Sequence, residues 1–350
     1  MTDKSPDAPT MHKRRARYPG KHPRRFEDKY KEFHPERYAA EVAMVVAAGK
    51  TPAGSHRPIM VDEVLNCLQP KPGEVAVDCT LGGGGHAQVI LEHLQPGGRL
   101  IGLDVDPFEL PRTEARLRAA GFAADTFVAH RANFAGLPAV LAREGLAAAD
   151  IVLADLGVSS MQVDNPARGF TYKAPGPLDM RMNPSQGESA SQMIARLSEA
   201  ALASLLVENA DEPHAAIIAG LIKQQPVLTT HALERLIRTG LHQALPSATK
   251  TDVKMSVRRA FQALRITVND EFAVLDTLLR VVPHCLEPGG RVAILTFHSG
   301  EDRRVKKAFQ AGFREGVYAD FAKEVIRSAK DETFSNRRAS AAKLRWAVRA

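Results

Sequence analysis

The chain has 350 residues, a net charge of +7 and a hydrophobic content of 44%, which suits one large globular domain or two smaller ones. No apolar run reaches the roughly 18–20 residues that a membrane helix needs, and the N-terminus has no apolar signal-peptide core. The three cysteines show no CxxC spacing, so neither a disulfide framework nor a zinc site is expected. We therefore expect a cytoplasmic protein without a membrane partner.

The charge is distributed unevenly along the chain. Residues 1–40 carry eleven lysines and arginines against six acids, and residues 303–350 carry thirteen against five. The long segment between them is mildly acidic. Two basic ends on an acidic body indicate a polyanionic partner, although solvated tails would show the same pattern.

Residues 1–55 differ from the rest of the chain in composition. Basic residues, prolines and aromatic rings alternate between Lys13 and Arg37. Basic side chains neutralise phosphates and rings stack on unpaired bases, so we expect a flexible extension that becomes ordered on RNA. The acidic residues of this segment argue against a transit peptide.

From His56 onward, the hydrophobic pattern predicts strands that alternate with helices. The expected helices in this part are Val61–Leu68, 88–94, 109–120 and 137–144. The expected strands are Val75–Asp78, Leu100–Asp104, Thr126–Ala129 and Ile151–Asp155. This alternation predicts an α/β fold, with a parallel sheet covered by helices on both faces.

The alternation stops after Asp155. Prolines and glycines predict a loop over residues 165–186, and helices follow over residues 188–245. The later expected elements are helices at 257–264 and 271–282, a fifth strand at Arg291–Thr296, and a closing antiparallel pair at Glu324–Ile326 and Leu344–Val348.

This pattern divides the chain into three parts. Residues 1–55 are the basic extension. Residues 56–164 and 251–350 form the main α/β domain. Residues 165–250 form an inserted loop and helical domain, to which we assign substrate recognition.

Four consecutive glycines, Gly82 to Gly85, stand between the first strand and the helix after it. Glycine allows positive φ and close approach of a ligand to the backbone, and ligands of open α/β sheets bind beyond the carboxyl ends of the strands. Asp104 ends the next strand, 22 residues after Gly82, where a carboxylate suits the two hydroxyls of a ribose. NAD and S-adenosylmethionine both fit this pattern, and a tight turn without a ligand is the third interpretation.

Further polar residues lie near expected strand ends. Asp155 begins Asp-Leu-Gly-Val-Ser-Ser-Met-Gln and either faces the reacting end of a cofactor or caps a loop. Asp179 and Arg181 lie in a proline-rich loop, either as part of a lid or as a structural pair. His298 follows the fifth strand as a cleft or structural residue, and His86 is either a cofactor contact or a helix N-cap. The histidine spacings match no metal motif, so no metal is expected.

Seven ordered motifs together resemble one known family. They are Asp78–His86 (DCTLGGGGH), Asp104–Pro107 (DVDP), Asp155–Asp164 (DLGVSSMQVD), Arg168–Tyr172 (RGFTY), Pro177–Met182 (PLDMRM), Phe261–Glu271 (FQALRITVNDE) and Ile294–Ser299 (ILTFHS). The chain resembles the RsmH (MraW) family of S-adenosylmethionine-dependent methyltransferases from His56 nearly to its C-terminus. That family makes N4-methylcytidine in the 16S rRNA of the small ribosomal subunit.

The resemblance implies a class I methyltransferase (Rossmann-like) fold with an inserted helical domain, and S-adenosylmethionine rather than NAD. Its cofactor contacts fall on Gly84, Gly85, His86, Asp104, Phe134, Asp155 and Gln162. It implies small-subunit rRNA, or the small subunit itself, as the partner. Asp155 is the first candidate for the catalytic hydrogen-bond acceptor, with Asp179 and His298 as further candidates.

Basic residues near the C-terminus are the expected phosphate contacts: Arg303, Arg304, Lys306, Lys307, Arg337 and Arg338. Three features depart from the family pattern, namely Gly300 after His-Ser, the motif at 336–345, and the extension 1–55. These departures leave another rRNA base open as the target. Two competing interpretations also stay open, an RNA-binding ribosome-assembly factor and an NAD-dependent oxidoreductase. The target nucleotide and the oligomeric state are not determined by the sequence.

Overall fold

The computed structural model describes residues 58–336 and 338–350. The chain divides into two units, Met1–His56 and Arg57–Ala350, and the following description concerns the second. The predicted extension 1–55 and Arg337 lie outside the described residues.

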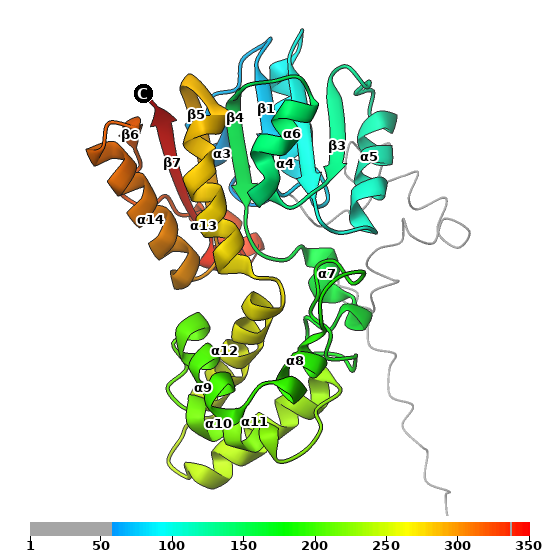
Figure 1. Cartoon of the computed structure of the whole chain (residues 1–350), viewed down its shortest axis with the longest axis vertical. Coiled ribbons are helices and arrows are strands. Elements are labelled where there is room, and N and C mark those ends of the chain that lie inside the picture. Colours follow the sequence, from blue (N-terminus) through cyan, green and yellow to red (C-terminus); the bar gives the residue numbers. More distant parts are fainter. Residues whose placement is uncertain (1–57, 337) are drawn as a thin grey trace, which may run out of the picture. The chain divides into compact units, whose positions relative to one another are not determined.

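A seven-stranded sheet forms the centre of the described unit, with the strand order β3-β2-β1-β4-β5-β7-β6 (Figure 1). Its strands are β1 Val75–Asp78, β2 Arg99–Asp104, β3 Phe127–Arg131, β4 Ala149–Asp155, β5 Leu286–Thr296, β6 Tyr318–Phe321 and β7 Lys343–Arg349. The first five are parallel, and β7 pairs antiparallel with both β5 and β6. The predicted parallel sheet is confirmed.

The predicted closing pair is only half correct. Its second strand is β7, but the partner of β7 is β6 rather than Glu324–Ile326. Tyr318 anchors β6 because its ring is buried against Phe309, with ring centroids 5.5 Å apart. Ile326 forms only an isolated bridge to Leu344.

Helices cover both faces of the sheet, as predicted. They are α3 Val61–Leu68, α4 Gly85–Leu94, α5 Glu109–Ala119, α6 Leu137–Arg143, α13 Glu271–Val281 and α14 Ser299–Arg314. Two further short helices of this unit are α7 Ser160–Asp164 and α15 Lys330–Ser335. Alternate residues of β4 serve the two faces. Val152 packs in the core beneath α6, α13 and α14, whereas Ile151 and Leu153 pack in the core beneath α3, α4 and α5.

Between β4 and β5 a second group of helices builds a hydrophobic core of its own (Figure 1). These helices are α8 Ala190–Arg196, α9 Glu199–Ala210, α10 Ala215–Lys223, α11 Thr230–Ala244 and α12 Lys250–Val268. Four of the five begin at a Ser or Thr whose hydroxyl accepts a backbone N–H of the first turn. None of the helices in residues 58–336 or 338–350 is long and apolar enough to cross a bilayer.

Helix α12 belongs to this helical core. Val253, Val257 and Leu264 are buried there together with residues of α9, α10 and α11. The sequence-based division places the end of the insertion at residue 250, at the start of α12. We propose instead that the insertion ends near Asn269, because α12 buries its apolar face among the inserted helices.

Two helical glycines in this core should respond oppositely to the same substitution. A Cβ on Gly240 would lie 2.6 Å from Cδ2 and 3.0 Å from Cγ of Leu221, whereas one on Gly220 would meet only the flexible end of Glu199 at 3.4 Å. Gly240→Ala should therefore destabilise the protein, because overpacking costs about 1–3 kcal/mol. Gly220→Ala should stabilise it by about 0.5–1 kcal/mol through helix propensity. Urea denaturation of both variants checks this, and equal effects would contradict the packing.

Candidate active site at the carboxyl edge of the sheet

The carboxyl ends of the central strands bring the candidate residues together. Asp78, Asp104 and Asp155 end β1, β2 and β4, and β1 lies between the other two strands. The chain after β1 bonds to both neighbours: Cys79 N donates to Leu153 O (2.8 Å) and Leu81 N to Leu103 O (2.8 Å). Sheet order reverses here, which is where open α/β sheets bind ligands.

The glycine turn is required by its own geometry. Gly84 has φ +68°, and a Cβ there would lie 2.6 Å from Cγ2 of Thr113. At Gly85 a Cβ would lie 2.7 Å from Cγ of Pro58. These contacts account for both glycines through packing, and they bring the turn close to α5 and to the start of the described chain.

Asp104 holds the glycine turn in place. Its Oδ2 accepts Gly82 N at 2.7 Å, and its Oδ1 accepts Asp106 N at 2.8 Å. Burial raises the pKa of Asp104 despite these bonds. The side chain is only partly buried and each carboxylate oxygen has a second lone pair, so it can still accept ribose hydroxyls. Phe134, half-buried, follows β3 at the same edge and begins η2, Phe134–Gly136.

His86 lies in the first turn of α4, and the N-cap of that helix is Gly84. The interpretation of His86 as an N-cap is therefore wrong. Its Nε2 lies 2.9 Å from Ile59 O, to which it donates, and Nδ1 lies 3.6 Å from Oδ2 of Asp155. Burial lowers the pKa of His86, so the neutral ring presents an unprotonated Nδ1 toward Asp155.

Asp155 is the least satisfied carboxylate of the group. Its amide donates to Oγ1 of Thr80 at 2.6 Å, but its own Oδ1 is buried without a hydrogen-bond partner among the described residues. Burial and the nearby Glu301 carboxylate raise the pKa of Asp155 to about 7. Buried polar atoms are almost always hydrogen-bonded, so an orphaned oxygen at this edge indicates a ligand-binding position.

Gln162 uses its side chain within the protein. Its Nε2 donates to Oδ2 of Asp106 (2.8 Å) and its Oε1 accepts Ser159 N (2.9 Å). Ser159 in turn caps α7 by accepting Gln162 N at 3.1 Å. The polar residues after Asp155 therefore order this segment of the chain.

Asp179 and Arg181 form a bidentate ion pair, in agreement with the structural interpretation of these residues. Arg181 Nε donates to Oδ1 (2.9 Å) and Nη2 donates to Oδ2 (2.7 Å) of Asp179. Burial opposes ionisation, but the bonds from Arg181 outweigh it and hold the pKa of Asp179 below its usual value. Each side chain is 22% exposed. Within residues 58–336 and 338–350, no hydrogen bond or ion pair joins Asp179 to Asp155 or His298.

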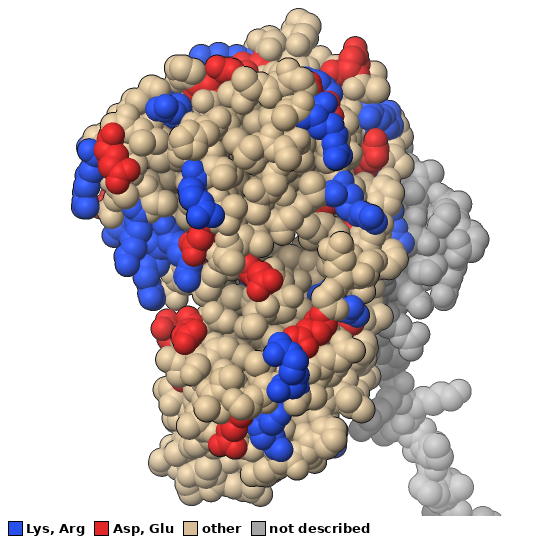
Figure 2. All heavy atoms as spheres, viewed as in Figure 1, with Lys and Arg blue, Asp and Glu red and all other residues tan. Residues whose placement is uncertain are grey.

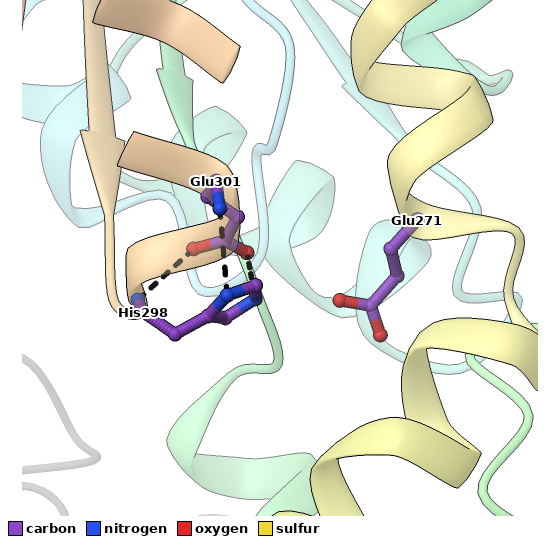
Figure 3. Close-up of side chains that lie close together, drawn as sticks. All are labelled: Glu271, His298 and Glu301. Atoms are coloured by element: carbon purple, nitrogen blue, oxygen red, sulfur yellow. Dashed lines mark hydrogen bonds and ion pairs between the residues drawn. The ribbon is translucent and has the colours of Figure 1, made fainter. Parts of the chain in front are cut away.

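His298 begins α14 as its N-cap (Figure 3). Its Nδ1 accepts Glu301 N at 3.4 Å, and Oε2 of Glu301 accepts Phe297 N at 2.8 Å. Because Nδ1 is the acceptor, the ring N–H lies on Nε2, which is buried 3.1 Å from Oε1 of Glu301 without hydrogen-bond geometry. His298 therefore has a structural role as the N-cap of α14, one of the two roles that the sequence allowed.

Glu271 faces His298 and Glu301 from the start of α13 (Figure 3). These three side chains lie close enough to surround a cation. However, Arg265 already binds Glu271 through two bonds of 2.8 Å, and Nε2 of His298 is a donor in the tautomer described above. Burial raises the pKa of Glu301, but His298 and Arg265 outweigh it and lower the pKa overall. The carboxylate of Glu271 is therefore already bound by Arg265, and that of Glu301 by the amides of Phe297 and His298.

The predicted phosphate contacts differ in availability. Arg303, Lys306 and Lys307 are exposed on α14, where Figure 2 shows basic side chains gathered. Arg304 stacks on Phe272, with its Cζ 3.6 Å from the centroid of the ring. Arg338 binds Ser160 and Asp164 and thereby ties the C-terminal segment to α7.

The sequence model of the MraW methylase family matches residues 53–350. The chain belongs to the MraW methylase family. It is 47% identical over 342 residues to "Ribosomal RNA small subunit methyltransferase H 2" of Alkaliphilus metalliredigens, covering 96% of this chain and 97% of that protein. It is 46% identical over 346 residues to "Ribosomal RNA small subunit methyltransferase H 1" of Agathobacter rectalis, covering 97% and 98%.

Among solved structures, TrmN from Thermus thermophilus aligns with a TM-score of 0.39 and 14% identity, over 83% of this chain and 48% of that one. This similarity is too remote to carry an argument. The two relatives above are more informative about the extension, because alignments covering 96% and 97% of the chain include most of residues 1–55. The family model begins at residue 53, in agreement with the interpretation of residues 1–55 as an addition to the family pattern, and these two relatives share most of that addition.

The raised pKa of Asp155 predicts a pH-dependent effect of Asp155→Asn. A carboxyl whose folded pKa is about 7 favours folding when protonated, and this contribution is lost as the pH rises through 7. The melting temperature of the variant should therefore rise relative to that of the wild type between pH 5 and pH 8. The expected change is about 2–4 °C for each kcal/mol of difference in the free energy of unfolding. Thermal melts across this range measure the difference.

Asp179→Asn is the matched control for this prediction. Its lowered pKa gives the opposite sign, since its contribution is present at neutral pH and lost as the pH falls through the folded pKa. The melting temperature of Asp179→Asn should therefore lie below that of the wild type at neutral pH, and the difference should become smaller as the pH falls. A pH-independent offset for Asp155→Asn would contradict the burial argument.

Proposed function

We propose that the protein transfers a methyl group from S-adenosylmethionine to N4 of a cytidine in small-subunit rRNA. The observation that carries this proposal is the orphaned Oδ1 of Asp155, which lies at the same edge of the sheet as the glycine turn and Asp104, with β1 between the two carboxylates. The printed names of the relatives supply the class of substrate. The N4 position follows from the resemblance of the motifs to the RsmH family.

The residues at the carboxyl edge fit this cofactor. Asp104 would accept hydrogen bonds from the ribose hydroxyls, and Phe134 would pack beside the adenine. The ligand would approach the protein backbone closely at the turn that contains Gly84 and Gly85. Asp155 and His86 would face the reacting end. Gln162 would contribute by holding the Asp106 turn, because its side-chain amide is already engaged there.

The chemistry requires a better nucleophile more than a stronger electrophile. S-adenosylmethionine supplies a methyl group already activated by its positive sulfur. The N4 lone pair of cytosine is delocalised into the ring, so an acceptor for N4–H would return electron density to nitrogen. Oδ1 of Asp155 can accept that hydrogen bond. It accepts best when the carboxyl is ionised, which requires a pH above its pKa of about 7. The target base must leave its stack to reach this edge.

The RNA would lie along the exposed basic face of α14 (Figure 2). Arg303, Lys306 and Lys307 begin one to two turns after His298, close to the carboxyl edge of β5. Basic side chains neutralise phosphates without reading sequence, so selection of the nucleotide falls to the inserted helical domain and the loop over 165–182. Arg337 and Arg338 stay predictions, and Arg338 would first have to release Ser160 and Asp164.

Mapping of methylated cytidines in small-subunit rRNA by mass spectrometry tests the proposal. Cells that lack this gene should lose one N4-methyl mark, and the wild-type gene should restore it. A strain carrying Asp155→Ala should fail to restore the mark because the acceptor is gone. An unchanged map would contradict the proposed reaction, and loss of a mark from another base would assign the chain to a different target.

Asp104→Asn tests the cofactor site directly. Asparagine removes the negative charge and one acceptor oxygen, and a hydrogen bond to a charged group is worth about 1.5–3 kcal/mol. We expect S-adenosylhomocysteine to bind about 10- to 100-fold more weakly in calorimetry. Asp150→Asn is the matched control, because Asp150 also accepts a backbone amide, Val75 N at 2.8 Å, but at the amino end of the sheet. Equal affinity in wild type and Asp104→Asn would refute the assignment.

A further inference from the structure

A buried ion pair lies directly beneath the candidate cofactor site. Asp106 follows Asp104 by two residues, is 0% exposed, and donates its amide to Oδ1 of Asp104 at 2.8 Å. Its own Oδ2 accepts Gln162 Nε2 (2.8 Å) and Arg168 Nη1 (2.7 Å). Its Oδ1 accepts the amides of the following turn. Asp104, whose carboxylate is the proposed acceptor for the ribose hydroxyls, is thus linked to Arg168 by two hydrogen bonds through Asp106.

The other edge of Arg168 reaches the loop that carries the Asp179–Arg181 pair. Nη2 donates to Arg181 O at 3.1 Å and to Met182 O at 2.8 Å. The side chain is 10% exposed, and its guanidinium lies over the rings of Phe108 and Phe170. A guanidinium offers several donors in a rigid plane, so this one side chain can bridge Asp106 and two carbonyls, which a lysine cannot do.

The loop itself has a backbone that must be held in place. Met180 has φ +65° and is 1% exposed, although a left-handed conformation costs a non-glycine residue about 1–2 kcal/mol. Such a conformation persists only where its surroundings determine it. A Cβ on Gly169 would lie 2.6 Å from Asp179 N, and Asn269 bonds both Met182 N (2.7 Å) and Met180 O (2.8 Å).

We propose that Arg168 is a positioning residue that couples occupancy of the cofactor site to the order of loop 177–182. The chain of contacts runs from Asp104 to Asp106, through Arg168, to the carbonyls of Arg181 and Met182. The inference rests on the proposed function, in which Asp104 receives the ribose of the cofactor. A ligand on Asp104 restrains the Asp106 turn, and the restraint reaches the loop that carries the Asp179–Arg181 pair. Such coupling is reciprocal, so an ordered loop also favours cofactor binding.

The chain contains a closely matched control in Arg291. It binds the carboxylate of Glu74 (2.7 and 2.8 Å), and it donates to Leu68 O (2.8 Å) and Gln69 O (3.0 Å). Its side chain is 14% exposed. Arg168→Lys and Arg291→Lys therefore lose the same kinds of bond at similar burial. Arg291, however, binds Glu74 just before the first residue of β1, at the opposite end of that strand from the candidate site.

The test is amide hydrogen exchange of residues 177–182 in the full chain, with and without saturating S-adenosylhomocysteine. In the wild type the ligand should slow exchange in this loop by at least about fivefold, the lower end of typical coupling. Arg168→Lys should still bind the ligand but lose most of this protection. Arg291→Lys should keep it, since a general loss of stability does not remove the link.

Two results would overturn the proposal. One is wild-type protein that binds S-adenosylhomocysteine without any change of exchange in residues 177–182. The other is Arg168→Lys, or Asp106→Asn if the first variant does not fold, that retains wild-type protection. Wild-type protein that fails to bind the ligand at all would instead refute the proposed function, and this inference with it.

Discussion

The carboxyl edge of the sheet depends on how several closely spaced carboxylates obtain hydrogen bonds. A carboxylate withdrawn from water is costly unless donors surround it. Asp78 accepts Thr80 N at 3.0 Å, Asp104 accepts two backbone amides, and Asp106 accepts four donors including Arg168. Asp155 alone in this group keeps a buried oxygen without a partner in the described part of the chain. The carboxylates that accept these donors hold the turns of this edge in place, and the unsatisfied oxygen of Asp155 is the one that the proposed function uses.

A second constraint is the attachment of the inserted helices. Helix α12 ends one residue before Asn269, whose side chain holds the backbone of loop 177–182. Arg265, in the last turn of α12, binds Glu271 at the start of α13. The loop that carries Asp179 is therefore held from the cofactor side by Arg168 and from the insertion by Asn269. In the proposed function, this double attachment would connect substrate recognition by the insertion to the carboxyl edge of the sheet.

The strength of local patterns explains which predictions were confirmed. Strands β1, β2 and β4 were predicted to within two residues because each is a short apolar run that ends on Asp. The closing pair was half wrong because β6 has four residues, two of them exposed, and its position depends on the packing of Tyr318 on Phe309. The sequence allowed His86 to be the N-cap of α4. It does not show that Gly84, in a left-handed conformation, is the N-cap and that the helix starts at Gly85.

The sequence by itself determined the parallel sheet, the switch point with its glycine turn, and the family, because these are written in contiguous runs of residues. Only the tertiary structure decided which carboxylates are satisfied and which is left unpaired. The partners of Asp106 lie 56 and 62 residues further along the chain, and the bonds that hold Met180 and Met182 come from Asn269. Hydrogen bonds between such distant residues leave no periodic signal in the sequence, since they arise only when the packed elements bring donor and acceptor within reach.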